Sequence, residues 1–555
     1  MYVVDIPYTS KKGKTYHSVL LRESYREGSK VRNRTIANLS RCTPQEITAI
    51  KLALKHKEDI AFLFPDTVQS VQLQKGLSVG AVWAVYQVAE RLGIQKALGN
   101  QREGKLALWQ VIARVIEQGS RLSAVRLART HAACDILGIN DGFNEDDLYD
   151  NLRWLADHQK EIEQKLFSKR RGKDKPGLFY YDVTSSYLEG EHNQLAAYGY
   201  NRDKKKGKMQ IVIGLLCDEQ GEPVSVDVFS GNTQDPNTVS CQIQKVTGLF
   251  GCHHVIFVGD RGMVKSKQVQ SLTDAELYYI TAITKPQVET LIKSKVLGLD
   301  MFCESVNEVL DAEAGVRYIL RRNAQRAEEL KATRQSKRKC MEQLVSQQNV
   351  YLSEHKGAVV SVALGKVSAR IEQLKAQTWL KVKSEGRVLC LEQDQKALEK
   401  ESRLDGCYVI KTDVPQHIAS KQLIHDRYKD LSLVEIAFRT CKTAHLEMRP
   451  VYVQTEDSTR GHVLVVMLAY LVVRELSRRW ASFDVTVQEG LSQLSMLCAM
   501  EMRVNNSITC LKLPKPCEQT LKLLEALGVT LPSALPHKGV NVVTKKQLGQ
   551  KRKKP

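Results

Sequence analysis

The sequence predicts an α/β fold in which a mixed sheet is flanked by helices and interrupted by an insertion. The apolar runs predicted as strands cover 178–184, 209–217, 224–229, 254–259 and 277–283. The first three are joined by polar connections, which is typical of antiparallel strands, whereas a predicted helix precedes each of the last two. This order of strands and helices is that of a ribonuclease H-like sheet.

The sequence before this sheet predicts two smaller regions. Residues 1–42 alternate apolar and polar side chains between basic turns, which predicts β-hairpins. A helix start follows, with Thr43 as N-cap, Pro44 at the first position and Glu46 at the third. Apolar residues recur at helical spacing from about 77 to 170. We interpret 43–175 as a helical, DNA-binding region; a plain scaffold is the equal alternative.

The predicted sheet is divided between 176–285 and 403–480. The segment 286–402 interrupts the pattern, and we interpret it as an insertion domain. It contains a highly charged helical stretch at 321–348. Such a charge run suits either a solvated helix face or a surface that contacts phosphates.

After the charged stretch, strand-like runs at 387–391 and 407–410 are expected to restore the sheet pattern. Helices are expected from there to about residue 530, and 481–555 is predicted to hold C-terminal helices and a basic tail. The apolar run from Val463 to Val473 is too short to span a bilayer, so no membrane association is expected.

Charge and cysteine content narrow the class of protein. The chain has 555 residues, 43% of them hydrophobic, and a formal net charge of +20. This favours a globular protein with a polyanionic partner, most commonly nucleic acid, although a basic protein without such a partner is the alternative. The 13 cysteines include no Cys-x-x-Cys pair and no signal peptide is apparent, so we expect a cytoplasmic, nucleoid-associated protein.

Two aspartates occupy informative places in the predicted sheet. Asp182 follows an aromatic run on the first strand, although Asp is disfavoured in strands. Asp260 ends the fourth strand, where open sheets place their ligands; a turn or helix-capping Asp is the alternative. Carboxylates that converge from separate elements suit a pair of magnesium ions and phosphodiester chemistry.

A third acid, Glu435, lies on a predicted helix beside an apolar stripe. Glu435, Arg439 and Lys442 share one face at positions i, i+4 and i+7. Periodicity leaves two readings open. Glu435 is either half of a surface ion pair with Arg439, or a metal ligand whose basic neighbours hold phosphate.

The segment around Glu435 resembles DDE transposases of bacterial insertion sequences, in the insertion-sequence-four-like superfamily and its branch with a long insertion. That superfamily carries Tyr, two residues, Arg, three residues, Glu, six residues and Lys. Tyr428, Glu435 and Lys442 match this spacing, but Leu431 stands at the arginine position. We hypothesise that Arg427 or Arg439 substitutes there. The segments 229–235 and 260–263 also resemble motifs of the family.

The resemblance implies a ribonuclease H-like fold and an active site of known type. It implies Asp182, Asp260 and Glu435 as catalytic and metal-binding residues, with two Mg²⁺ ions that Mn²⁺ can replace. It also implies DNA or phosphate contacts for the basic and aromatic residues of the same segment, which are Tyr428, Arg439 and Lys442.

The function implied is that of a transposase. Such an enzyme binds the terminal inverted repeats of a mobile element, cleaves the DNA and transfers the strand into target DNA, and we expect a homodimer on DNA. A ribonuclease H-like nuclease and an inactive DNA-binding derivative are the alternatives. The presence of all three acids argues against the inactive derivative, but hydrolysis and strand transfer share the same metal site.

Overall fold

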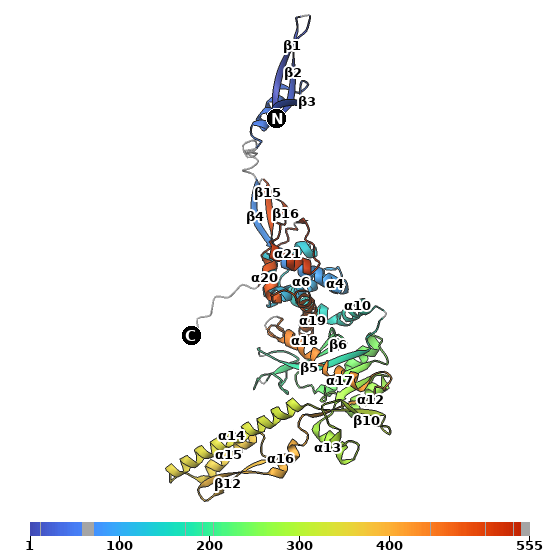
Figure 1. The fold of residues 1–555 in the computed structure, drawn as a ribbon, viewed down its shortest axis with the longest axis vertical. Helices are drawn as coiled ribbons and strands as arrows, with labels where there is room; N and C mark the ends of the chain where they lie inside the picture. Colours follow the sequence, from blue (N-terminus) through green and yellow to red (C-terminus); the bar gives the residue numbers. More distant parts are fainter. Residues whose placement is uncertain are drawn as a thin grey trace.

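The computed structural model has an eight-stranded mixed sheet at its centre (Figure 1). It describes residues 1–545 except Lys12, 58–70, Lys173, Glu191, Lys204, 444–445, 505–506 and His537. In chain order the strands of the sheet are β5 (Leu178–Tyr187), β6 (Gln210–Asp218), β7 (Pro223–Ser230), β8 (Ile256–Gly259), β9 (Tyr278–Ala282), β10 (Asn307–Asp311), β11 (Val316–Arg322) and β14 (Cys407–Thr412).

The first five of these strands have the ribonuclease H-like order predicted from the sequence. Across the sheet the order is β10-β11-β14-β9-β8-β5-β6-β7. β5, β6 and β7 pair antiparallel, whereas β8 pairs parallel with both β5 and β9. Every residue of β6 is buried, which explains why its sequence is a continuous apolar run rather than an alternating one. The predicted fold class is confirmed.

The sheet extends beyond β9 through three further strands. β14 pairs antiparallel with β9, β11 with β14, and β10 with β11. The segment 286–402 therefore contributes β10 and β11 to the central sheet. The part of it that leaves the sheet is an arm built from α14 (Ala324–Glu354), α15 (Val360–Gln373), β12 (Leu380–Glu385), β13 (Val388–Gln393) and α16 (Gln395–Ser402).

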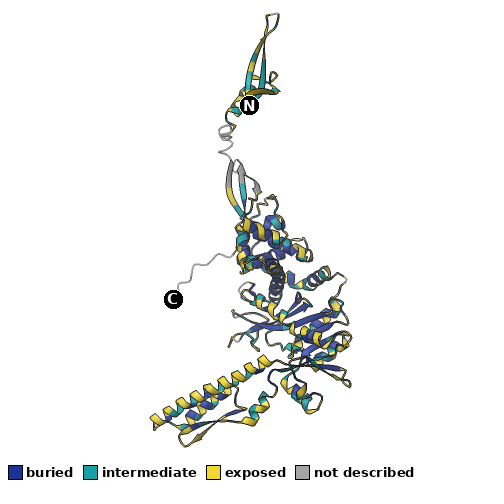
Figure 2. Cartoon of the chain, viewed as in Figure 1, coloured by how far each residue is buried: buried dark blue, intermediate teal, exposed yellow. Residues whose placement is uncertain are grey.

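The arm has buried residues of its own, enclosed by mostly exposed ones (Figure 2). They form an apolar core that includes Met341, Val367 and Trp379. The predicted charged helix is present as α14. The run at 387–391 does form a strand, but it pairs with β12 in a separate two-stranded sheet. The expectation that this run restores the central sheet is therefore wrong, because Leu389 packs into the core of the arm.

Helices cover both faces of the sheet. On one face lie a 3₁₀ turn (Asp235–Thr238), α11 (Val239–Gln244), a π turn (Lys245–Leu249) and α12 (Ser266–Asp274), and α13 (Lys285–Lys293) follows β9. The helical region before the sheet comprises α4 (Gly80–Leu92), α5 (Ile94–Leu98), α6 (Arg102–Ile116), α7 (Arg121–Thr130), α8 (Ala133–Leu137), α9 (Glu145–Asp157) and α10 (Gln159–Arg171). After the arm come α17 (Lys421–Lys429), α18 (Ser432–Lys442) and α19 (Glu456–Arg479).

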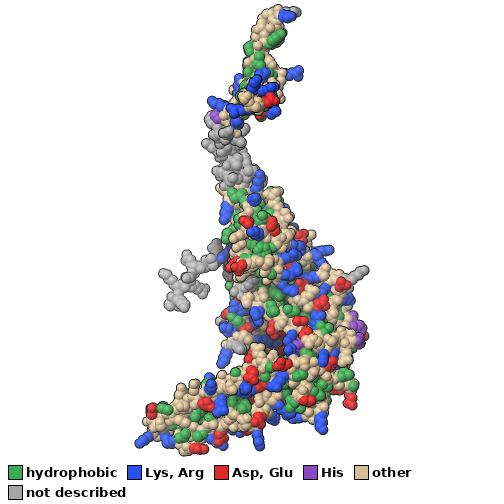
Figure 3. Space-filling model, viewed as in Figure 1, with side chains coloured by type: hydrophobic (Ala, Val, Ile, Leu, Met, Phe, Trp, Pro, Cys, Tyr) green, Lys and Arg blue, Asp and Glu red, His purple; other side chains and the backbone are tan. Residues whose placement is uncertain are grey.

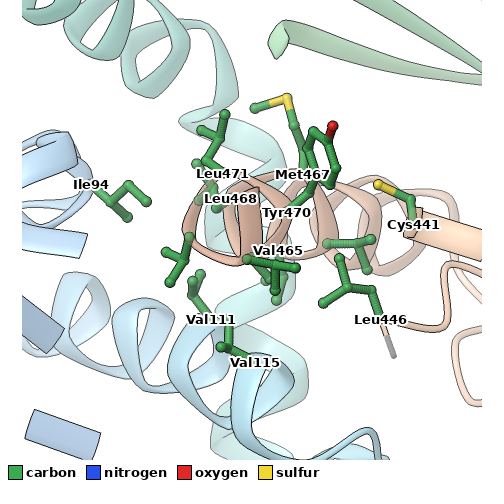
Figure 4. Close-up of a cluster of buried hydrophobic side chains, with 14 of the residues drawn as sticks. Ile94, Val111, Val115, Cys441, Leu446, Val465, Met467, Leu468, Tyr470 and Leu471 are labelled. Atoms are coloured by element: carbon green, nitrogen blue, oxygen red, sulfur yellow. The ribbon is translucent and has the colours of Figure 1, made fainter. Parts of the chain in front are cut away.

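The long helix α19 joins the helical region to the sheet. Val465 and Leu468 of α19 lie near Val111 and Val115 of α6 in one buried cluster (Figure 4). α19 also contacts α9 and β7. At its closest approach a side chain on Gly461 would meet the carbonyl oxygen of a residue in α9 at 2.0 Å, so only glycine fits there. The expected buried helix is thus the centre of the largest core.

The N-terminal segment forms the predicted three-stranded antiparallel sheet. Its strands are β1 (Tyr2–Thr9), β2 (Thr15–Glu27) and β3 (Lys30–Asn38). α1 (Pro44–Lys55) follows, and the Thr43 side chain accepts from the Glu46 amide while Glu46 accepts from the Thr43 amide. This reciprocal capping confirms the predicted helix start. Lys and Arg side chains occur on this sheet, on the body and on the arm (Figure 3).

The C-terminal segment differs from the sequence-based expectation. After α20 (Val487–Ser495), β15 (Cys498–Val504) and β16 (Ser507–Lys512) form a sheet with β4 (Val71–Ser78) and β17 (Ala534–Leu535), and α21 (Glu518–Ala526) lies between β16 and β17. The expectation of helices throughout is wrong here, because the partner strand β4 is distant in sequence. No helix among the described residues is long and apolar enough to cross a membrane.

Candidate active site

The three acids singled out from the sequence line one open cavity of about 460 Å³. Asp182 lies on β5 and Asp260 directly follows β8. The parallel register places Tyr181 opposite Gly259. Asp182 directly follows Tyr181 and Asp260 directly follows Gly259, so the two aspartates stand at matching positions of neighbouring strands. Glu435 stands in the first turn of α18, which contacts β5. The fold therefore brings together three carboxylates from two neighbouring strands and one helix.

Asp182 is the carboxylate whose ionisation this cavity disfavours. Burial, together with the negative charges of Asp260 and Glu435, raises the pKa of Asp182 to about 7. The Val183 amide, which donates to Asp182 Oδ1 at 2.8 Å, and the nearby Arg202 oppose this shift. A bound cation would favour the ionised form of this carboxylate.

The donor set suits magnesium, which prefers carboxylate oxygens and is usually held by one or two of them, with water and substrate phosphates completing its shell. Within the described part of the chain, no three acidic, His or Cys side chains are gathered closely enough to hold one ion by themselves. Three acids around one cavity can still provide one or two ligands to each of two ions. The residues present therefore fit a metal of this type.

Tyr428, on α17, fixes one oxygen of Asp260. Its hydroxyl donates to Asp260 Oδ1 at 3.1 Å, and the amide of Arg261 donates to the same oxygen at 2.7 Å. Burial and the charge of Asp260 raise the pKa of Tyr428, so its hydroxyl keeps the proton that it donates. The Asp260 carbonyl accepts from the Met263 amide in a turn, but α12 starts only at Ser266, so Asp260 does not cap that helix.

Lys442, at the end of α18, connects this helix to β5. Its Nζ donates to the Ser185 carbonyl oxygen at 2.7 Å and to Thr184 Oγ1 at 3.2 Å, and it forms an ion pair with Asp203 at 2.5 Å. Lys442 also lines the cavity of the three acids. It therefore holds α18 in place while presenting a positive charge at the cavity wall.

Arg439 lines the same cavity as Glu435. No ion pair joins these two side chains, both of which belong to the described part of the chain, so the surface-pair reading of Glu435 finds no support. Leu431, at the position where the family pattern has arginine, is buried at the start of α18. Of the two arginines considered as substitutes, Arg439 reaches the cavity, whereas Arg427 hydrogen-bonds to Tyr180.

Three further residues of the cavity were missed, or noted only within a motif, by sequence reasoning. Arg202 Nη2 donates to both carboxylate oxygens of Asp235 at 2.6 Å. The Arg202 guanidinium lies 5.9 Å from the centre of the Tyr200 ring, which is 83% exposed. All three residues line the cavity. Basic residues interleaved with tyrosines between β5 and β6 are a signal from which this surface was predictable.

Comparisons with known proteins give two family models and one solved structure. A family model described as the transposase DDE domain matches residues 174–472, more than half of the chain. A model of the N-terminal domain of IS1634 family transposases matches residues 7–62. No curated protein gives a match. A cryo-electron microscopy structure of a piggyBac transposase synaptic complex with hairpin DNA has 8% identity and a TM-score of 0.35, over 70% of each chain.

The match across the central sheet shows the class of protein, and the chain belongs to the DDE transposases. In its N-terminal part the chain resembles transposases of IS1634-like insertion sequences. The resemblance found in the sequence around Glu435 is thereby confirmed at the level of the family.

Proposed function

We propose that this transposase binds the terminal inverted repeats of its mobile element and catalyses metal-dependent cleavage and strand transfer of DNA. The observation that carries the proposal is that Asp182, Asp260 and Glu435 all line the same open cavity. These acids come from separate elements and converge at the carboxyl end of β8, where open sheets place their ligands.

In this proposal Asp182, Asp260 and Glu435 hold two Mg²⁺ ions, which Mn²⁺ can replace. When bound, such ions activate a water or a 3′-hydroxyl and stabilise the leaving oxygen. Tyr428 keeps one oxygen of Asp260 in a fixed orientation through its 3.1 Å hydrogen bond. A carboxylate held in this way has less freedom to lose when it binds an ion.

The cationic side chains of the cavity are proposed to hold the DNA backbone. Arg202, Arg439 and Lys442 all line the cavity together with Glu435. Arg439 has no ion-pair partner among the described residues, so its guanidinium is available to a phosphate. Tyr200 offers an exposed ring for stacking on a base.

A homodimer on DNA is proposed because two element ends must be processed in concert. A DNA substrate would place the protein at the nucleoid in the cytoplasm. The nuclease alternative uses the same carboxylates and differs only in the nucleophile, so the joining step must decide between them.

The decisive experiment is an end-cleavage and joining assay with labelled element ends and a target plasmid. We expect Asp260→Asn to lower cleavage by at least about 10²-fold while leaving end binding nearly unchanged. Asp274→Asn, an exposed acid at the end of α12, is the matched control and should retain full activity. Full cleavage by Asp260→Asn would overturn the site assignment, and cleavage by the wild type without joining would favour a nuclease.

A further inference from the structure

A second cavity, of about 250 Å³, lies between the helical region and the segment that follows α18. We call it the arginine cavity. Its walls include Arg114 from α6, Arg121 and Ser120 at the start of α7, Tyr149 from α9 and His462 from α19. None of these residues belongs to the cavity of the three acids.

Arg121 carries a buried charge that forms no ion pair with a carboxylate among the described residues. Its side chain is inaccessible, with 5% of the residue exposed. One terminal nitrogen donates to Gln110 Oε1, and the other lies 3.4 Å from His462 Nδ1. Both partners are uncharged when His462 is neutral, and burial lowers the pKa of Arg121 to about 9. An ion buried in this way is unfavourable without a counter-ion.

Arg114, which lines the same cavity as Arg121, is a second buried arginine. It is also 5% exposed, and its Nη2 donates to the Gly119 carbonyl oxygen at 2.7 Å. Burial lowers the pKa of Arg114 to about 10, and the largest effect that opposes this shift comes from the charge of Glu447. Glu447, however, already forms an ion pair with Arg449. Two neighbouring guanidinium groups therefore face the cavity with little negative charge of their own.

The charges that line the cavity can be compared directly. Its three guanidinium groups face only two carboxylates, those of Glu189 and Glu447, so one positive charge remains uncompensated. Both carboxylates are bound by Arg449, with Glu189 at 3.1 Å. Among the described residues, Arg114 and Arg121 therefore have no ion-pair partner of their own.

His462 provides an independent sign of a missing ligand. It is 5% exposed, it lines the cavity, and its Nε2 forms no hydrogen bond of good geometry, although backbone carbonyl groups of Met448 and Arg449 lie near the ring. Burial, followed by the charges of Arg114 and Arg121, holds the pKa of His462 well below its usual value. Buried polar atoms rarely lack a partner in native proteins. An anion in the cavity would favour the protonated imidazole and could accept its hydrogen bond.

We propose that the arginine cavity binds a phosphate-type oxyanion through Arg114, Arg121 and His462. The start of α7 adds the positive end of a ten-residue helix, which also favours an anion. The volume of about 250 Å³ corresponds to about eight waters of about 30 Å³ each, which exceeds what the four oxygens of one phosphate need.

Two sources can supply this group. Arg449 lines both the arginine cavity and a groove that contains Arg439 and Lys442, and these two residues border the cavity of the three acids. A DNA strand that leaves the proposed active site along this basic groove would bring a backbone phosphate to the arginine cavity. Free inorganic phosphate is the other source, and it does not depend on the proposed catalytic function.

The first test compares thermal unfolding of the full-length protein in sodium phosphate and in sodium chloride at equal ionic strength. Phosphate stabilises many proteins through exclusion from their surface, so the difference between variants is the readout. We expect phosphate to raise the Tm of the wild type by about 2 °C or more beyond that of Arg121→Met. Arg334→Met removes a half-buried arginine that is paired with Asp405, and this matched control should keep the full increment.

An equal phosphate increment in all three proteins would overturn the proposal. Titration calorimetry of inorganic phosphate into the wild type gives a second readout that needs no variant, in case Arg121→Met does not fold. A saturable one-site heat is expected, and the lack of one would also overturn the proposal.

The source of the phosphate is then decided by DNA binding of Arg121→Met at several salt concentrations. Weaker end binding, with a salt slope reduced by about one, assigns the site to a DNA phosphate. Unchanged end binding together with loss of the phosphate increment assigns it to free phosphate. The assignment to a DNA phosphate rests on the proposed function. The assignment to free phosphate does not, and it holds even if Asp260→Asn leaves cleavage intact.

Discussion

Replacing Tyr428 by phenylalanine tests how the proposed metal site is supported. The change removes the hydroxyl that donates to Asp260 Oδ1 at 3.1 Å and leaves the ring in place. A hydrogen bond to a charged group contributes about 1.5–3 kcal/mol, and about 1.4 kcal/mol corresponds to a tenfold change in affinity. Tyr428→Phe should therefore lower the affinity for Mg²⁺ by about 10–100-fold, as for other residues that orient a metal ligand.

The assay is the rate of end cleavage over a range of Mg²⁺ concentrations. The midpoint for Tyr428→Phe should move to higher Mg²⁺, with activity recovering as Mg²⁺ is raised. Tyr180→Phe is the control, because the Tyr180 hydroxyl donates to Asp430 at 3.3 Å and not to an acid of the cavity. A midpoint for Tyr428→Phe equal to that of the wild type would refute the reasoning, and so would an equal shift in the control.

Three further changes have defined outcomes. Lys442→Met should weaken end binding and reduce the slope of log affinity against log salt by about one; an unchanged slope would restrict Lys442 to holding α18 on β5. Burial raises the pKa of Asp413 from 3.8 to about 6, so the wild type loses stability as pH rises through this range. Asp413→Asn should remove this loss, so the free energy of unfolding of the variant relative to the wild type, measured in urea, should be about 3 kcal/mol higher at pH 8 than at pH 4. An equal pH dependence of the two proteins would contradict the raised pKa of Asp413. Leu431→Arg should destabilise the protein by on the order of 3 kcal/mol in the same assay, because it buries a charge, and unchanged stability would be the contrary result.

The features that the sequence predicted well are those set by local patterns. Each of β5 to β9 is an apolar run between turns, and the capping residues of α1 are adjacent in the chain. The pairing of β4 with β15 and the extension of the sheet through β10, β11 and β14 depend on contacts between distant segments. No local pattern contains the register of such pairs, so these features had to come from the structure.

The candidate site shows the same division. Asp182 and Asp260 followed from their places on and after predicted strands, but the periodicity of α18 left Glu435 open between an ion pair and a ligand. Whether Glu435 is a ligand depends on the direction in which its face of α18 points. That direction is set by the contact of α18 with β5. Arg121 and His462 could not be predicted as a cluster, because they lie on helices far apart in the sequence.

The long separation between Asp260 and Glu435 is compatible with one site because of how the arm is attached. β11 ends at Arg322, which pairs with Cys407 at the start of β14, so the chain leaves and re-enters the sheet at adjacent positions. Gly406 makes this return possible, since its φ is +73° and a side chain there would meet the Asn323 carbonyl oxygen at 2.2 Å.

From this fixed point the chain returns to the site by a short route. β14 pairs with β9, and α17 and α18 then pass over β8 and β5, which places Glu435 beside the two aspartates. Loop closure costs only about 0.6 kcal/mol for each doubling of loop length. The length of the arm therefore has little influence on the position of Glu435, which is determined by the pairing of β11, β14 and β9.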